Sequence, residues 1–114
     1  MMRSFGVKGE DVAAAYLKKK GYKILQRNYR TPLGEADIIA KDRDTIVFVE
    51  VKARTTEAYG QPFEAVDCRK QERLRRIALF YLKQAKAEMP LRFDVISIMS
   101  RSGRDVVHHI VEAF

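Results

Sequence analysis

The sequence predicts an α/β fold, a three-layer α/β/α sandwich with a central mixed five-stranded sheet. Stretches with helical or strand periodicity follow one another in the order helix, three strands, helix, two strands. Two helices separated by three strands are available to cover both faces of one sheet. The 114 residues, of which 46% are apolar, suffice to bury a core, so we expect a single domain over residues 1–114.

The first predicted helix spans Val7–Lys20. Ser4 is its candidate N-cap, and Gly21 ends it after three consecutive lysines, which suit the negative C-terminal end of a helix. Its buried side consists of Ala13, Ala14, Tyr16 and Leu17. Glu10 lies one turn before this stripe and points with it. Either Glu10 belongs to a site at this end of the helix, or it only complements the helix dipole.

The next segment, Tyr22–Arg30, is predicted to be an edge strand. Its alternation is imperfect because Ile24 and Leu25 are adjacent and both apolar. The segment Thr31–Gly34 contains a proline and a glycine, so we expect a turn there that leads into a hairpin.

The hairpin that follows, Gly34–Arg54, holds the most informative pattern of the chain. Its second strand, Thr45–Ala53, is almost entirely β-branched or aromatic, but Glu50 and Lys52 interrupt the apolar run. Charged residues are rarely buried without a partner or a role. Because side chains alternate along a strand, Glu50 and Lys52 project from the same face.

The first strand of the hairpin adds carboxylates to that face. Glu35 and Asp37 are two residues apart and therefore also share a face. A turn at residues 43–44 places Asp37 opposite Glu50 in an antiparallel pair. A slip of one residue would send one set of charges to the other face and mismatch the apolar faces. We therefore expect two or three carboxylates and a lysine to meet in one patch.

A loop and a second helix come next. Thr55–Val66 has no periodicity and contains glycine and proline, so we expect a loop, a common place for ligand contacts. Asp67 is predicted to cap a helix that runs to about Glu88. The buried stripe of this helix consists of Leu74, Ile77, Ala78, Tyr81, Leu82 and Ala85.

The remaining positions of the second helix are densely basic. They include Arg69, Lys70, Arg73, Arg75, Arg76, Lys83 and Lys86. A solvated face is the commonest explanation of such a run. The candidate nucleic-acid contacts are Arg54, Arg69, Lys70, Arg73 and Arg76. Lys70 differs from the others because it lies four residues before Leu74 and continues the inward stripe. It is therefore a candidate to reach the carboxylates.

The chain closes with a predicted hairpin of Leu91–Met99 and Asp105–Val111, after a Met-Pro step that ends the helix. We expect Asp94 to pair with a nearby arginine rather than to act in catalysis. His108 and His109 are adjacent, so on a strand they face opposite ways and cannot both bind one metal ion.

The composition favours a polyanionic partner. The net charge is +7 and the pI is near 9.7, which makes nucleic acid the first expectation and an anionic membrane surface the second. A generally basic protein without such a partner is the alternative. The only cysteine, Cys68, excludes an intrachain disulfide and favours a reducing cytoplasm. No apolar run reaches the length of a membrane span, and charge favours nucleic acid over a membrane surface, so we expect no membrane partner.

The clustered carboxylates predict a metal site. Oxygen ligands without histidine or cysteine favour Mg²⁺ or Mn²⁺ over zinc. Asp37 and Glu50 are the predicted ligands, with Glu10 or Glu35 as further or water-mediated contacts. Clustered carboxylates repel one another, which raises their pKa. A bound cation offsets this repulsion. Lys52 would orient the attacking water or stabilise negative charge in the transition state. Together these parts fit metal-assisted hydrolysis of a phosphodiester.

Two motifs carry a resemblance to known proteins. GEAD in one strand, followed by VFVEVKAR in the next, resembles the PD-(D/E)xK nuclease signature. The chain also resembles the YraN-like family of small bacterial proteins, through GEDVAAAYLKKKGYKILQRNYR, GEADIIAKD, FVEVKAR, RFDVISI and the terminal EAF. This resemblance spans essentially the whole chain. It implies a restriction-endonuclease-like fold similar to that of archaeal Holliday-junction resolvases.

The resemblance also implies roles for individual residues. It makes Asp37, Glu50 and Lys52 the catalytic core and Glu10 the acid from the helix. The proline that usually precedes the aspartate is replaced by alanine here, and Glu35 comes before that alanine. This departure leaves open whether Glu35 is an added ligand or a neighbour that only tunes Asp37.

Three functions fit these observations. The first is a magnesium-dependent nuclease that acts on DNA rather than RNA, with branched or structured DNA as the expected substrate. The second is a nucleic-acid-binding module with the same fold and little or no turnover. The third treats Glu50 and Lys52 as a structural ion pair, which is disfavoured because such pairs add little net stability. A homodimer is a further expectation, since two-fold branched substrates suit symmetric dimers.

Overall fold

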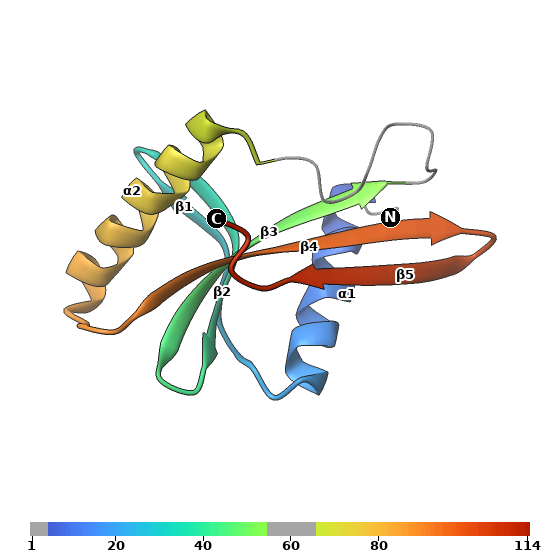
Figure 1. Ribbon diagram of the computed structural model, residues 1–114, viewed down its shortest axis with the longest axis horizontal. Coiled ribbons are helices and arrows are strands. Elements are labelled where there is room, and N and C mark those ends of the chain that lie inside the picture. The colour runs from blue at the N-terminus through green and yellow to red at the C-terminus, as the bar shows by residue number, and fades with distance from the viewer. Residues whose placement is uncertain (1–4, 55–65) are drawn as a thin grey trace.

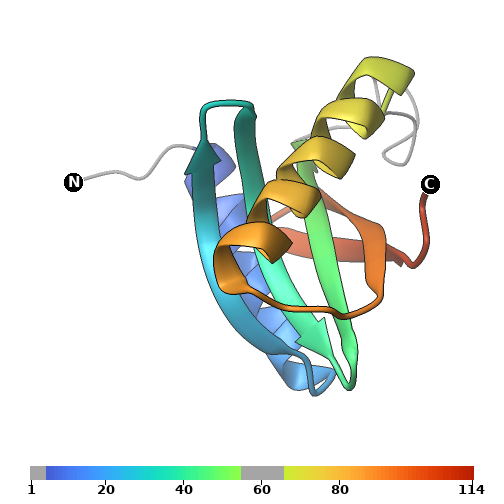
Figure 2. The same ribbon diagram turned by 90° about the vertical axis from the view of Figure 1, so that its left-hand side faces the viewer.

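The computed structural model describes residues 5–54 and 66–114, in which two helices cover opposite faces of one five-stranded sheet (Figures 1 and 2). The elements are α1 (Phe5–Lys19), β1 (Lys23–Thr31), β2 (Gly34–Asp42), β3 (Thr45–Arg54), α2 (Cys68–Ala85), β4 (Leu91–Arg101) and β5 (Arg104–Ile110). The predicted three-layer α/β/α sandwich is confirmed. The predicted Ser4 cap and all but the last residue of the predicted loop 55–66 lie outside the described residues.

The strands lie in the order β1-β2-β3-β4-β5, and only the β3–β4 pair is parallel. Parallel neighbours need a long crossover connection, and α2 lies within the crossover between β3 and β4. This topology puts α2 on one face of the sheet while α1 covers the other, as Figure 2 shows. The sheet is therefore mixed, as predicted.

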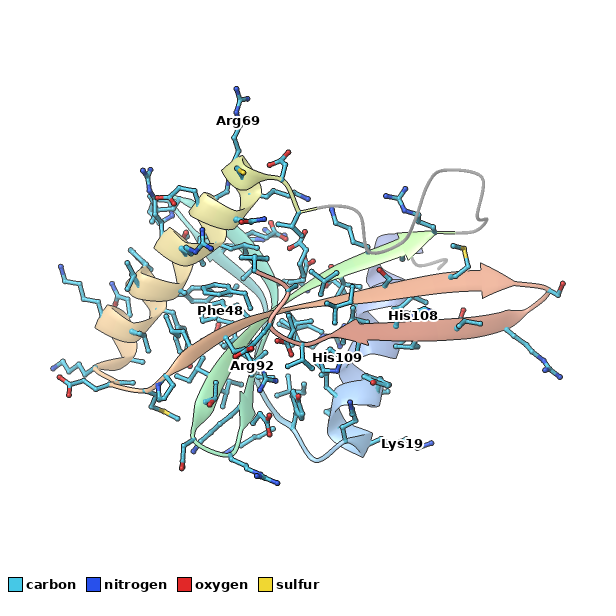
Figure 3. The ribbon with its side chains drawn as sticks, viewed as in Figure 1. Lys19, Phe48, Arg69, Arg92, His108 and His109 are labelled. Atoms are coloured by element: carbon cyan, nitrogen blue, oxygen red, sulfur yellow. The ribbon has the colours of Figure 1, made fainter. Side chains whose placement is uncertain are left out.

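A separate apolar core lies on each side of the sheet. On the α1 side the buried residues are Ala13, Ala14, Leu17, Ile38, Ala40, Val47, Val49, Ile96 and Ile98. On the α2 side they are Ala36, Ile39, Ile46, Phe48, Leu74, Ile77, Ala78 and Phe93. Strands covered on both faces are apolar at successive positions, which explains the composition of β3. Figure 3 shows Phe48 between the sheet and α2.

Both ends of α1 lie one or two residues from their predicted positions. The helix begins two residues before Val7 and ends at Lys19, one residue before the predicted end. The N–H of Tyr22 donates to the carbonyl of Leu17 and that of Gly21 to Lys18, each at 3.0 Å. This is a Schellman motif, and Gly21 permits it because its φ is +93°. A helix end of this kind fixes where β1 begins.

Strand β1 contains the irregularity that its sequence indicates. Its pairing with β2 shifts register between Ile24 and Gln26, so one extra residue lies between two regular stretches. Ile24 packs against the core on the α1 side, and Leu25 packs against the core on the α2 side. Two adjacent apolar residues in this strand therefore serve different cores.

The central hairpin has the predicted register. Asp42 pairs with Thr45 across the two-residue turn, and the pairing continues to Ile38 and Val49. The next positions along the two strands are Asp37 and Glu50. The face that carries them is the α2 face, because the neighbouring pair of Ile39 and Phe48 packs there. The predicted turn at residues 43–44 is confirmed.

Helix α2 begins as predicted and ends earlier. The Asp67 carboxylate accepts the backbone N–H of Lys70 at 3.0 Å, so Asp67 is the N-cap. The helix ends at Ala85 rather than about Glu88, because Lys86 adopts the left-handed conformation with φ +52°. Ala85 is exposed, which corrects its prediction as part of the buried stripe. Leu82, in the same last turn, packs against the core on the α2 side.

The closing hairpin is confirmed and is longer than predicted in its first strand, which continues to Arg101. As expected, Asp94 pairs with an arginine: the Arg92 guanidinium donates to both carboxylate oxygens, at 2.9 and 3.0 Å. His109 Nε2 lies 2.7 Å from Asp94 Oδ2. The two histidines face opposite ways, with His109 inside and His108 exposed (Figure 3).

The Asp94 cluster joins several parts of the fold. The Arg92 guanidinium also donates to Asp42 Oδ2 at 2.9 Å and to the hydroxyl of Tyr22 at 2.7 Å. The backbone N–H of Glu112 donates to Asp94 Oδ1 at 3.1 Å. Burial alone would raise the pKa of Asp94, but hydrogen bonds from His109 and Arg92 outweigh it and lower this pKa. The cluster is therefore a structural network in which one guanidinium pairs with two carboxylates.

Neither of the two helices in the described segments is long and apolar enough to cross a membrane.

Candidate functional site

An open pocket of about 360 Å³ lies where β2 and β3 stop pairing. Its lining residues are Glu10, Asp37, Glu50, Val51, Lys52, Ala53, Arg54 and Lys70. They come from α1, β2, β3 and α2, so the pocket joins both helical layers. The ladder between β2 and β3 ends at the pair of Ile38 and Val49. Beyond this pair, the N–H of Val51 on β3 donates to Asp37 Oδ2 at 2.9 Å rather than to a backbone carbonyl of β2.

Helix α1 brings Glu10 to this pocket through a very close contact with β3. A methyl group on Gly9 would lie only 2.8 Å from the Cβ of Ala53. Real Cβ atoms do not approach each other so closely, so any larger residue would push the helix away from the strand. Gly9 thus sets the depth at which Glu10 enters the pocket.

Helix α2 brings Lys70 to the same pocket. Its Nζ lies 3.3 Å from Glu50 Oε1, and the Lys52 Nζ lies 3.9 Å from the same oxygen. The Glu50 side chain is only 13% exposed, so its charge is desolvated and needs these partners. Lys70 therefore points inward, toward the carboxylates, as its spacing in the helix predicts.

The electrostatics of the pocket centre on Asp37. Burial raises the pKa of Asp37 to about 7, and the negative charges of Glu50 and Glu10 add to the increase, whereas the N–H of Val51 opposes it. Burial also raises the pKa of Glu10, while the charge of Arg27 lowers it. Two carboxyl groups in the pocket thus have a pKa above the ordinary value of their residue type.

Lys52 and Lys70 shift each other's pKa in opposite directions. Burial lowers the pKa of Lys52, and the ammonium of Lys70 lowers it further through a hydrogen bond and its charge. The same hydrogen bond to Lys52, together with the charge of Glu50, raises the pKa of Lys70 against the effect of burial. Lys70 is therefore the lysine that holds its positive charge more strongly.

Not every predicted site residue lies in the pocket. Glu35 is exposed on β2 and lies 3.8 Å from Arg30, at the edge of the sheet. It acts on the pocket at a distance, because its charge raises the pKa of Glu10. Among the predicted basic contacts, Arg54 and Lys70 line the pocket, and Arg54 Nε is buried without a hydrogen-bond partner in the described residues.

The other three predicted basic contacts gather elsewhere. Arg69, Arg73 and Arg76 line a second hollow, on the face of α2 beside the stripe that carries Lys70. Figure 3 shows Arg69 projecting from the first turn of α2, away from the sheet. The basic residues of α2 therefore divide between two neighbouring sites.

The family model described as "Uncharacterised protein family UPF0102" matches residues 9–98. The chain belongs to this family. The YraN-like resemblance in the sequence is thereby confirmed. The matched range contains every residue that lines the pocket.

Several members of the UPF0102 family align over nearly the whole chain. A UPF0102 protein of Syntrophomonas wolfei subsp. wolfei is 47% identical over 115 residues, which cover 100% of both chains. One of Thermodesulfovibrio yellowstonii is 48% identical over 109 residues, covering 96% of this chain and 94% of its own. One of Alkaliphilus oremlandii is 47% identical, and 100% of each chain is covered.

The pocket of this UPF0102 chain brings two carboxylates, Asp37 and Glu50, together. The Glu50 carboxylate lies close enough to Asp37 for its charge to raise the pKa of Asp37. In the part of the chain that the structure describes, no three His, Cys, Asp or Glu side chains gather closely enough to hold a metal ion. Mg²⁺ commonly takes one or two carboxylates and completes its shell with water and phosphate oxygens. The residues present therefore fit such an ion.

Three features of the pocket were not predicted from the sequence. The N–H of Val51 donates a hydrogen bond to Asp37, the buried Nε of the pocket residue Arg54 has no partner in the described segments, and Gly9 allows α1 to approach the sheet closely. A backbone N–H carries no sequence signal. The glycine at position 9, one residue before Glu10 and inside a helical pattern, was the available signal for a close helix contact.

Proposed function

We propose that this protein is a metal-dependent nuclease that hydrolyses phosphodiester bonds in DNA. The observation that supports it best is that Asp37, Glu50 and Lys52 line one open pocket, together with Glu10 and Lys70. Hydrolysis of a phosphodiester needs carboxylates for a cation and positive charges for the phosphate, and the pocket offers both. The restriction-endonuclease-like fold that the motifs imply and a cytoplasmic location agree with this proposal.

The pocket residues would divide the work of the reaction. Asp37 and Glu50 would hold Mg²⁺ or Mn²⁺, which when bound supplies a more acidic water molecule and polarises the phosphoryl group. Lys52 would orient the attacking water and stabilise negative charge as the water oxygen bonds to phosphorus. The bond from phosphorus to the leaving oxygen breaks, the water gives up a proton and the leaving oxygen takes one up. Glu10 would accept hydrogen bonds from water in the same pocket.

The basic residues around the pocket would bind the DNA backbone. Arg54 and Lys70 would contact the phosphate at the pocket, and Arg69, Arg73 and Arg76 would contact phosphates beyond it. Such contacts are independent of sequence and release counterions, so binding should weaken steeply with salt. The net charge of +7 fits this mode of binding.

A cleavage assay tests this proposal. We expect the purified protein to nick or cut DNA with Mg²⁺ or Mn²⁺ in a panel of linear, nicked and branched DNA and RNA substrates. Glu50→Ala and Lys52→Ala should reduce the rate by at least about 100-fold, whereas Lys83→Ala, on the exposed end of α2, should not. Cleavage that persists equally in all the variants would come from a contaminating nuclease and would refute the proposal.

One observation favours a binding module without turnover as the second candidate. The Glu50 carboxylate already has two ammonium groups within 4 Å, at 3.3 and 3.9 Å, so its charge is balanced without a cation. In that case DNA binding would depend on salt but would be the same with Mg²⁺ and with EDTA. It would also be unchanged by Asp37→Ala. A Mg²⁺-dependent affinity that Asp37→Ala abolishes would instead support the nuclease.

A further inference from the structure

The second hollow, of about 430 Å³, lies between the β1–β2 turn and the first half of α2. Its lining consists of Leu33, Cys68, Arg69, Glu72, Arg73 and Arg76. The helical members recur at helical spacing, so they form one stripe of α2. This stripe lies beside the one that carries Lys70 into the catalytic pocket, because Arg69 and Lys70 are consecutive. The hollow is thus the immediate neighbour of the proposed catalytic pocket.

The apolar side of the hollow is an exposed leucine held in place by its turn. Leu33 is 44% exposed, although it is a large hydrophobic residue. Its N–H donates to Thr31 Oγ1 at 3.0 Å, and the same hydroxyl donates to the Gly34 carbonyl at 2.9 Å. These bonds close the turn around Leu33. The leucine is therefore presented to solvent by a fixed backbone.

The basic side of the hollow is also fixed in part. The stem of Arg73 runs across the backbone of Gly34, since a methyl group on Gly34 would lie 2.9 Å from Arg73 Cδ. In residues 5–54 and 66–114, neither Arg73 nor Arg69 has an acidic ion-pair partner. Arg76 lies 3.4 Å from Glu72, but both side chains are more than half exposed, so that pair is weak. Two guanidinium groups are thus available to a ligand.

We propose that this hollow binds an unpaired nucleotide of the DNA substrate, next to the phosphate that is cut. The proposal rests on the nucleic-acid-binding function above. A nucleotide combines a flat apolar face with an anionic phosphate, and the hollow combines Leu33 with arginines that can both stack on a base and pair with a phosphate. In a regular duplex the base faces are covered by stacking, so Leu33 would have no partner there.

This arrangement predicts a substrate preference. Because Arg69 and Lys70 are adjacent, a base in the hollow belongs within a few nucleotides of the phosphate in the catalytic pocket. DNA with an unpaired base near the cut should therefore bind more tightly than a blunt duplex of the same length and charge. The preference should depend on Leu33 and on the guanidinium of Arg73 rather than on net charge alone.

Fluorescence of 2-aminopurine tests this inference in EDTA, where cleavage does not interfere. The probes are a blunt duplex and the same duplex with one unpaired 2-aminopurine. We expect the wild type to bind the second probe about fivefold more tightly and to change its fluorescence as the base leaves the stack. Leu33→Ser should remove both effects and leave blunt-duplex binding within about twofold. The charge-conserving Arg73→Lys should also remove the preference for the unpaired probe, because an ammonium does not stack on a base as a guanidinium does.

Leu79→Ser is the matched control, because Leu79 is 62% exposed on α2 and lies outside the hollow. Equal binding of both probes, or equal effects of the two leucine variants, would overturn the inference. A polyglutamate chain that displaces the unpaired probe as well as single-stranded DNA does would also overturn it, in favour of an acidic protein partner. If the wild type shows these binding differences but does not cleave DNA, only the proposed nuclease activity is refuted. If it cleaves DNA but binds both probes equally, only the proposed role of the hollow is refuted.

Discussion

The Asp37 carboxyl lies in an environment that favours its neutral form. Burial and the charge of Glu50 raise its pKa to about 7, well above its value in the unfolded chain. Between about pH 4 and pH 7 the folded protein therefore binds more protons here than the unfolded chain, so stability falls as the pH rises through this range. Above pH 7 the cost of ionisation is fully present unless a cation offsets it.

Cation binding should therefore depend on pH below neutrality. A cation bound to Asp37 must displace one proton below pH 7, so the apparent affinity for Mn²⁺ should increase about tenfold per pH unit from pH 5 to pH 7 and then level off. Isothermal titration calorimetry in buffers of different ionisation enthalpy would measure the affinity and the protons released. Asp37→Asn should abolish the pH dependence and, in EDTA at pH 8, raise the melting temperature. Equal affinity at pH 5.5 and pH 8 would contradict this prediction.

Lys70 should compete with a cation for Glu50. Its Nζ is 3.3 Å from Glu50 Oε1, in the space that a ligated ion would share. Lys70→Met keeps an unbranched side chain and removes the charge, so the affinity for Mn²⁺ should increase about fivefold, as for a partly exposed pair of about 1 kcal/mol. DNA binding should weaken in the same variant. Lys83→Met is the control, and unchanged Mn²⁺ affinity in Lys70→Met would show that the lysine does not oppose the cation.

At the scale of the elements, the position of α1 depends on Gly9. Gly9→Ala should destabilise the protein by about 1–3 kcal/mol, because the new methyl group would overlap the Cβ of Ala53. Chemical denaturation would measure the loss. Adding Ala53→Gly removes the opposing atom, so the double variant should be more stable than Gly9→Ala alone. If the second substitution only adds to the destabilisation, the close contact is not what limits this position.

The sequence predicted the elements well where local patterns decide them. Alternation and a two-residue turn were enough for the register of β2 and β3, which brings Asp37 next to Glu50. Helical spacing was enough to direct Lys70 inward. The end of α2 was predicted too late, at about Glu88 rather than Ala85, because Lys86 adopts a left-handed conformation that lysine does not favour. Contacts between distant segments, such as His109 with Asp94, have no local signal at all.

At the scale of the whole molecule, the Asp94 network joins β2, β4, β5 and the C-terminal residues. Asp94→Asn should destabilise the protein by about 1.5–3 kcal/mol, because it removes the buried charge that accepts two hydrogen bonds from Arg92 and leaves the guanidinium paired with the more exposed Asp42. Since the folded pKa of Asp94 is lowered, its stabilisation is present above about pH 4 and is lost as the pH falls through that lowered pKa. Urea unfolding at pH 7 and pH 3 would measure both effects.

Asp105→Asn is the control for this network, because Asp105 is exposed and its hydrogen bond within the described residues is local, to Ser100. It should change stability by less than about 0.5 kcal/mol. A comparable loss in the two variants at pH 7 would mean that the Asp94 network does not hold the strands together.

The parallel pairing of β3 with β4 also orders the events of folding. The β2–β3 hairpin closes through neighbouring residues, whereas Ile46 can meet Leu91 only after the whole crossover has returned to the sheet. Contacts between distant parts of a chain close slowly, so we expect the hairpin to form before β4 joins it. Asp37 and Glu50 would then be brought together before Lys70 arrives with α2. The early hairpin would carry Asp37 and Glu50 with Lys52 but without Lys70, so added divalent cations should speed its folding.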